Sequence, residues 1–180
     1  MVEVFFAQGT EEIEALTQVD VLRRAGVETC LVGVGGKVLA GAHDIVVQCD
    51  LEEGELPLDR LEMVVLPGGL PGAYHLNDSP VVQKALDRMA ETGGWMAAIC
   101  AAPLVLGRRG LTGGKRVTCY PGFEKELAGG LYTGAAVERD GRMITGNGPG
   151  AALPFALELV RALKGDETAE ALGGSMQWRR

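Results

Sequence analysis

Short, largely apolar runs, separated by stretches of helical periodicity and by glycine-rich turns, are the feature that most constrains the fold. Strands buried on both faces give runs of this kind, and they occur mainly in parallel sheets that helices cover on both sides. The clearest runs are residues 2–7, 28–34, 63–66 and 95–99. The sequence therefore predicts an α/β fold with a mainly parallel sheet between two helical layers.

The remaining elements follow from apolar spacing and turn residues. Ile13 and Leu16 belong to the apolar face of a first helix, which Thr10 would cap and Gly26 would end. Asp140-Gly141 predicts the turn of a hairpin. The other expected elements are helices at 79–92, after 100, at 151–163 and in the tail from 166, short strands at 44–47 and 116–118, a loop at 35–42, and irregular segments at 50–60 and 121–130.

Length and charge exclude several classes of protein. A chain of 180 residues fits one domain, residues 1–180, and the net charge of −7 disfavours a nucleic-acid partner. No apolar stretch reaches membrane-spanning length, and Glu3 interrupts the N-terminal apolar run without a basic segment before it, so we expect neither a membrane anchor nor a signal peptide. Four cysteines without C-x-x-C spacing and two distant histidines predict neither disulfides nor a metal site. We expect a cytoplasmic protein.

Cys100 is the strongest candidate for chemistry. It ends the apolar run 95–99, and Pro103 suits the first turn of a following helix. The sulfur would then lie on a tight strand-to-helix turn beside free backbone N–H groups, which favour the nucleophilic thiolate. The alternative is a small buried core residue, which is what most free cysteines are.

Two other loops, residues 8–14 and 67–72, should meet the loop 100–103, because ligands bind at the carboxyl ends of parallel strands. Glu14 lies in the first turn of the first helix, where acidic residues usually complement the helix dipole; a desolvated Glu14 would instead keep its proton and donate it to a thiolate. Gly68-Gly69 is either a simple turn or a place where a backbone N–H meets an oxyanion. Of the two histidines, His75 is the better candidate for lining a pocket.

Taken together, these segments resemble the DJ-1/ThiJ/PfpI superfamily, on its DJ-1-like branch. The matching segments run in order along nearly the whole chain: 9–14 (GTEEIE), 19–26 (VDVLRRAG), 64–69 (VVLPGG), 97–103 (AAICAAP) and 148–150 (GPG).

The resemblance implies a flavodoxin-like α/β sandwich and a homodimer that needs no cofactor. It also implies a reactive Cys100, a protonated Glu14 hydrogen-bonded to it, and an oxyanion site at the N–H groups of Gly69 and Ala101. The activities it implies are glutathione-independent glyoxalase III, which turns methylglyoxal into lactate, deglycation of early adducts, redox sensing through a cysteine sulfinate, and chaperone activity.

Two departures from the family pattern bear on function. Ala101 follows Cys100 where the protease-like branch has histidine, which argues against a peptidase. Tyr120-Pro121 and His43 stand where the DJ-1 branch has a histidine-proline pair and an arginine, so the substrate range of the pocket is open. We expect a glyoxalase or deglycase acting on small α-oxoaldehydes. The alternatives are a redox-responsive chaperone-type stress protein with little catalysis, and a purely structural or partner-binding dimer.

Overall fold

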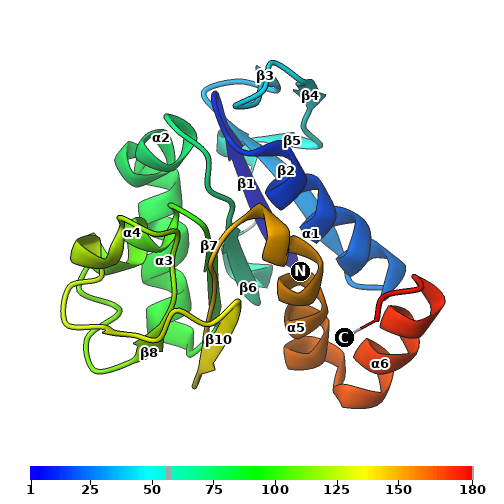
Figure 1. The fold of residues 1–180 in the computed structure, drawn as a ribbon. Helices are drawn as coiled ribbons and strands as arrows, with labels where there is room; N and C mark the ends of the chain where they lie inside the picture. Colours follow the sequence, from blue (N-terminus) through cyan, green and yellow to red (C-terminus); the bar gives the residue numbers. More distant parts are fainter. Residues whose placement is uncertain (56–57, 180) are drawn as a thin grey trace.

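A seven-stranded sheet runs through the computed structural model, which describes residues 1–55 and 58–179 (Figure 1). Its strands in chain order are β1 (Val2–Ala7), β2 (Thr29–Val34), β5 (Leu51–Glu52), β6 (Met63–Leu66), β7 (Trp95–Ile99), β10 (Val137–Asp140) and β11 (Met143–Gly146). Across the sheet the order is β10-β11-β7-β6-β1-β2-β5. All neighbours are parallel except β10 and β11, which form the predicted antiparallel hairpin.

Helices cover both faces of the sheet, so the predicted flavodoxin-like three-layer α/β sandwich is confirmed (Figure 1). One layer holds α1 (Glu12–Arg24), α5 (Ala152–Lys164) and α6 (Asp166–Ser175); the other holds α2 (Gly72–Asp78), α3 (Pro80–Thr92) and α4 (Pro103–Arg108). Both ends of α3 are capped. Ser79 accepts a hydrogen bond from the N–H of Val82, and Gly93 ends the helix with a φ of +68°.

The central strands are apolar because the helical layers exclude water from both of their faces. Every residue of β1 is buried, including Phe5 and Phe6, and β6 is buried throughout. Burying one such large side chain contributes roughly 1.5–3 kcal/mol. This core fixes the carboxyl ends of β1, β6 and β7 side by side, which is where the candidate site forms.

The structure adds elements that the sequence did not predict. The expected loop at 35–42 contains β3 (Val38–Ala40), which pairs antiparallel with β4 (Val46–Gln48), and β8 (Arg116–Val117) pairs with β9 (Leu131–Tyr132). The segment 50–60 contains β5 and 3-10 turns at Glu53–Glu55 and Leu58–Arg60; residues 56 and 57 lie outside the described residues. Further 3-10 turns lie at Glu124–Glu126 and Pro149–Ala151. Helix α2 was also missed, because its glycine start and lack of a capping side chain give no sequence signal.

The first turns of α1 place a different face against the core than the apolar spacing predicted; farther along the helix, Val19, Val21 and Leu22 are buried as that spacing predicted. Ile13 and Leu16 are 57% and 40% exposed, while Glu14 and Gln18 are fully buried. The polar residues face inward because backbone groups there need partners; the side-chain amide of Gln18, for example, donates to the carbonyl of Ala152 at 3.2 Å.

Its cap also differs from the prediction. The carboxylate of Glu11, not Thr10, accepts a hydrogen bond from the first turn, at the N–H of Glu14. The hydroxyl of Thr10 instead accepts from the N–H of Ala7 at the end of β1, at 2.9 Å. The short side chain of Thr10 therefore closes the turn between β1 and α1 rather than the helix itself.

Candidate active site

Cys100 lies on the sharp turn between β7 and α4, as its sequence neighbours predicted. Its φ is +65°, a left-handed conformation that costs a residue with a side chain roughly 1–2 kcal/mol. Two hydrogen bonds hold the backbone there, from its own N–H to the carbonyl of Gly146 at 2.9 Å and to its carbonyl from the N–H of Tyr120 at 2.8 Å. The strained turn lies at the carboxyl end of β7, so the sulfur is placed at the end of the sheet where the carboxyl ends of the parallel strands meet.

Glu14 reaches the same point from the opposite side. Its carboxyl is fully buried, and Oε2 accepts a hydrogen bond from the N–H of Gly68 at 2.8 Å. The carboxyl interacts with the Cys100 thiol. Burial raises the pKa of Glu14 to about 7, against the lowering effects of the Gly68 N–H and of Cys100. Glu14 can therefore hold or release a proton near neutral pH.

Gly68 makes this approach possible. A Cβ added there would lie 2.7 Å from the Cβ of Cys100, 2.8 Å from Oε2 of Glu14 and 2.9 Å from the N of Ala101. All three distances are shorter than side chains tolerate. The glycine thus allows the loop after β6 to pass between the thiol and the carboxyl.

The thiol and the carboxyl titrate as a coupled pair. Burial raises the pKa of Cys100 to about 12, and the charge of an ionised Glu14 adds to the rise. The N–H groups of Gly69 and Ala101 act in the opposite direction by interacting with the sulfur. The helix end and backbone amides therefore do not suffice to ionise Cys100. A thiolate forms here when Glu14 carries the proton that the two groups share.

A cavity of about 360 Å³ opens above the sulfur. Of the residues that the sequence singled out, Cys100, Gly69, Ala101 and Tyr120 line it, and Glu14 and Gly68 lie buried beside Cys100. His75 does not line it: its Nδ1 is 2.8 Å from the carbonyl of Gln8, in a separate cavity. The remaining lining residues are Glu11, Ala42, His43, Leu70 and Phe123.

Sequence reasoning placed the loop 67–72 at the site without singling out Leu70, and it did not place Phe123 there. Leu70 directly follows Gly68-Gly69, so its position after β6 was a usable signal. Phe123 comes from the turn-rich segment after Tyr120, and only the tertiary structure folds that segment over Cys100.

His43 lies at the rim of the cavity and pairs with Glu12. Its Nδ1 lies 2.9 Å from Oε2 of Glu12, a contact that raises the pKa of His43. Burial raises the pKa of Glu12, but hydrogen bonds from His43 and Ile45 outweigh it, and the pKa falls below its usual value. Glu11, Glu12 and His43 offer ligand atoms within 4.8 Å of one another, so a cation would compete with the His43–Glu12 pair there.

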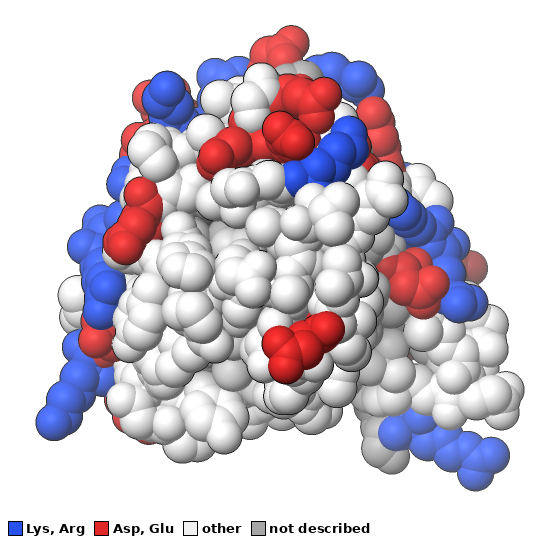
Figure 2. All heavy atoms as spheres, turned by 90° about the horizontal axis from the view of Figure 1, so that it is seen from above, with Lys and Arg blue, Asp and Glu red and all other residues white. Residues whose placement is uncertain are grey.

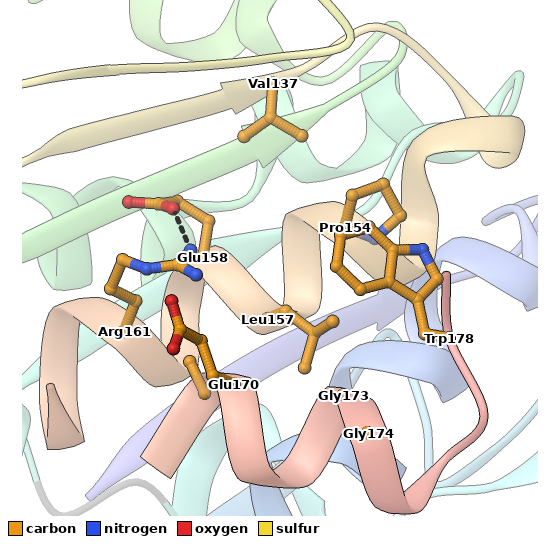
Figure 3. A pocket seen from close by; sticks show the side chains of 10 residues that line it. Val137, Pro154, Leu157, Glu158, Arg161, Glu170, Gly173, Gly174 and Trp178 are labelled. Carbon is orange, nitrogen blue, oxygen red and sulfur yellow. Dashed lines mark hydrogen bonds and ion pairs between the residues drawn. The ribbon is translucent and has the colours of Figure 1, made fainter. Parts of the chain in front are cut away.

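A second cavity, of about 470 Å³, lies between α5, α6 and β10 (Figure 3). Its walls are mainly apolar, with Trp178 beside Pro154 and with Val137 on the far side. Its charged groups include the Glu158–Arg161 ion pair at 2.7 Å. No cysteine, serine or histidine is among its described lining residues. Within residues 1–55 and 58–179, no helix has the length and apolarity to cross a bilayer.

Comparisons with known proteins agree with this geometry. A sequence model of the DJ-1/PfpI family matches residues 1–162. The chain is 39% identical to the Parkinson disease protein 7 homolog of Danio rerio over 178 residues, which cover 92% of this chain and 90% of that protein. It is 34% identical to the glutathione-independent glyoxalase DJR-1.2 of Caenorhabditis elegans over 167 residues, or 92% and 89% of the two chains. The crystal structure of Drosophila melanogaster DJ-1beta superposes with a TM-score of 0.93 at 34% identity, over 99% of this chain and 98% of that one.

Proposed function

The chain belongs to the DJ-1/PfpI family, and from this premise we propose that it is a cysteine-dependent, glutathione-independent glyoxalase III or deglycase acting on methylglyoxal-type α-oxoaldehydes or their early adducts. The observation that carries the proposal is the placement of Cys100 and Glu14. A nucleophilic sulfur faces a cavity, and a buried carboxyl with a pKa of about 7 lies beside it.

In the first step the Cys100 thiolate attacks the aldehyde carbon of methylglyoxal and forms a carbon–sulfur bond. The electron pair of the carbonyl moves to its oxygen, and the N–H groups of Gly69 and Ala101 stabilise that oxyanion. Glu14 then donates its proton to the oxygen, which gives a neutral hemithioacetal and leaves Glu14 ionised.

In the second step the carboxylate of Glu14 takes the proton from the former aldehyde carbon and delivers it to the neighbouring carbon. The hydroxyl proton on the former aldehyde carbon passes to the oxygen of the neighbouring carbon. The aldehyde carbon thereby becomes the carbonyl of a thioester, which is the oxidation, and the ketone carbon is reduced to an alcohol. Water hydrolyses the thioester, releases lactate and restores Cys100 and Glu14. The sum is methylglyoxal plus water giving lactate and one proton, so electrons balance within the substrate and no external redox cofactor is required.

Lactate production from methylglyoxal tests the proposal in wild type, Cys100→Ala and Glu14→Gln, with Cys30→Ala as the matched control outside the cavity. We expect Cys100→Ala and Glu14→Gln to lose at least about 100-fold in kcat/KM, and we expect Cys30→Ala to match wild type. Equal turnover in wild type, Cys100→Ala and Glu14→Gln would refute the proposal.

A second candidate function uses the same sulfur as a redox sensor in a chaperone-type stress protein with little catalysis. Cys100 is 8% exposed at the base of the cavity, within reach of peroxide. Two equivalents of hydrogen peroxide convert the thiol into a sulfinic acid and two waters, and a protonated Glu14 would hydrogen-bond the product. Intact and peptide mass after mild peroxide tests this role. A two-oxygen adduct confined to Cys100 in a protein without aldehyde turnover favours it, and no adduct at Cys100 rejects it.

We further propose that the active unit is a homodimer of a single domain, residues 1–180, that works in the cytoplasm without a nucleic-acid or membrane partner. Exposed Ile13 and Leu16 on α1, and exposed Ile45 and Val46 beside them, support a second copy as the partner. Oε1 of Glu12 accepts from the N–H of Ile45, which ties the two apolar segments together. All four cysteines are free, which supports a reducing compartment.

A further inference from the structure

Acidic side chains outnumber basic ones around Cys100. Glu11 lines the cavity, and its carboxylate is held in place by the N–H of Glu14 at 2.7 Å. His43 is the basic side chain among the described lining residues, and its contact of 2.9 Å with Glu12 offsets its charge. No lysine or arginine is found among those lining residues. The wall formed by the first turn of α1 therefore presents negative potential to anything that approaches the sulfur.

The outer surface at this end of the molecule adds few basic groups near its middle. Figure 2 looks down on the end where β3 and β4 lie, and uncharged residues fill most of its middle. Lysines and arginines gather mainly toward the periphery of that view. A substrate that carries a carboxylate or a phosphate would thus meet no lysine or arginine among the described lining residues. It would meet only His43, which already pairs with Glu12, and it would be repelled by Glu11.

The rest of the cavity is apolar and partly aromatic. Leu70, Tyr120, Phe123 and Ala42 line it, and the volume of about 360 Å³ exceeds the roughly 150 Å³ that accommodates a benzene ring in a protein cavity. The backbone N–H of Phe123 donates to the carbonyl of Tyr120 at 3.1 Å, which holds the two aromatic residues on one turn. An aryl or alkyl group next to the reacting carbonyl can pack there.

We propose that this cavity selects uncharged carbonyl compounds with an apolar or aryl substituent and excludes anionic aldehydes. The inference rests on the proposed function for the identity of the reacting group. Its selectivity comes from Glu11 and Phe123, neither of which takes part in the bond-making steps.

The first arm of the test measures turnover. We expect kcat/KM for glyoxylate, an anionic oxoaldehyde, to be at least about 100-fold below that for methylglyoxal. Repulsion between like charges a few ångströms apart in a partly buried site is large enough to lower kcat/KM by a factor of this order. We expect phenylglyoxal to match or exceed methylglyoxal. Phe123→Ala should lower kcat/KM for phenylglyoxal at least about fivefold more than for methylglyoxal. Turnover of glyoxylate at the rate of methylglyoxal overturns the charge selection, and an equal loss for both neutral substrates overturns the aryl subsite.

The second arm does not depend on turnover. Alkylation of Cys100 by neutral iodoacetamide and by anionic iodoacetate is followed by peptide mass, with each rate divided by the rate for glutathione. We expect the normalised rate for iodoacetate to be at least about tenfold lower than that for iodoacetamide. This difference between the two rates should shrink in Glu11→Gln and stay unchanged in Glu91→Gln, a change at an exposed residue of α3. A protein without aldehyde turnover that still shows this gap refutes the glyoxalase and supports the selectivity. Equal normalised rates for iodoacetate and iodoacetamide would overturn the inference.

Discussion

Oε2 of Glu14 accepts a hydrogen bond of 2.8 Å from the N–H of Gly68, a residue 54 positions away along the chain. This bond joins the first turn of α1 to the loop after β6, and it orients the carboxyl against the thiol of Cys100. The geometry of the site thus depends on a backbone donor and on a residue without a side chain.

The coupling of Glu14 and Cys100 predicts a two-step ionisation of the site. In wild type, the rate of Cys100 alkylation by iodoacetamide should rise near pH 7, where the pair loses its first proton, and rise again at a much higher pH, where it loses the second. Glu14→Gln should show one ionisation, at a pKa below the upper one of wild type, because the carboxylate charge is gone. A single transition near pH 8.5 in both proteins, as for an ordinary thiol, would contradict the coupling.

Gly68→Ala should disrupt the site through sterics alone. The added methyl would lie 2.7 Å from the Cβ of Cys100 and 2.8 Å from Oε2 of Glu14, so we expect a loss of about 1–3 kcal/mol in unfolding free energy and loss of aldehyde turnover. Gly174→Ala is the matched control, because a Cβ there meets nothing within 4 Å and lies in α6. Urea unfolding of the two variants makes the comparison, and equal stabilities would argue against the tight approach at Gly68.

The left-handed backbone of Cys100 predicts an unusual order of stabilities. Cys100→Gly should be more stable than Cys100→Ala by about 0.5 kcal/mol, because glycine removes the Cβ strain at φ +65° and this outweighs its greater freedom in the unfolded chain. At Ala97, in the middle of β7, a change to glycine should instead cost about 1 kcal/mol. Chemical unfolding measures both; a lower stability of Cys100→Gly would show that the turn is not strained.

Glu3 predicts a pH-dependent loss of stability. Its carboxyl is buried in β1 with no hydrogen-bond partner among the residues that the structure describes, and burial raises the pKa of Glu3 from 4.5 to about 7. Between pH 4.5 and 7 the unfolded chain releases this proton while the folded chain keeps it, so unfolding free energy falls as pH rises through that window. Glu14 shifts in the same direction and adds to the fall.

Glu3→Leu should therefore raise the unfolding free energy at pH 8 by about 2 kcal/mol and make the decline between pH 4.5 and 7 shallower. Glu3→Gln should remove the same part of the pH dependence with a smaller gain, because its amide stays unsatisfied. Stability curves at several pH values make the measurement. Parallel curves for wild type and Glu3→Leu would mean that Glu3 does not titrate abnormally.

The exposed apolar residues of α1 predict an interface. Leu16→Asp should convert a dimer into a monomer in light scattering coupled to size-exclusion chromatography, because it places a charge in the centre of the proposed contact. Leu131→Asp, at an exposed position of β9, is the control and should leave the mass unchanged. A monomeric wild type, or a dimer that survives Leu16→Asp, would count against this face.

Local patterns could predict the layers of the fold and the position of Cys100. The runs at β1, β6 and β7 are apolar on both faces because helices cover both faces, and Pro103 after Cys100 suits the first turn of a helix. Sequence patterns gave the wrong result where a contact between residues distant in sequence decides which side chain is buried or which one lines the cavity. Ile13 and Leu16 are exposed because Glu12, Glu14 and Gln18 satisfy distant backbone groups, and His43 rather than His75 reaches the cavity because β3 and β4 fold over α1.

The sequence by itself determined the α/β architecture, the strand-to-helix turn that carries Cys100, and the identity of the acid that could serve it. Only the tertiary structure decided the protonation of the site, because the pKa values of Cys100 and Glu14 depend on burial and on each other's charge. It also decided what lines the cavity, since Leu70, Phe123 and His43 come from three separate loops. Hydrophobic periodicity reports which local face is buried, whereas electrostatics and cavity shape depend on which distant residues are brought into contact.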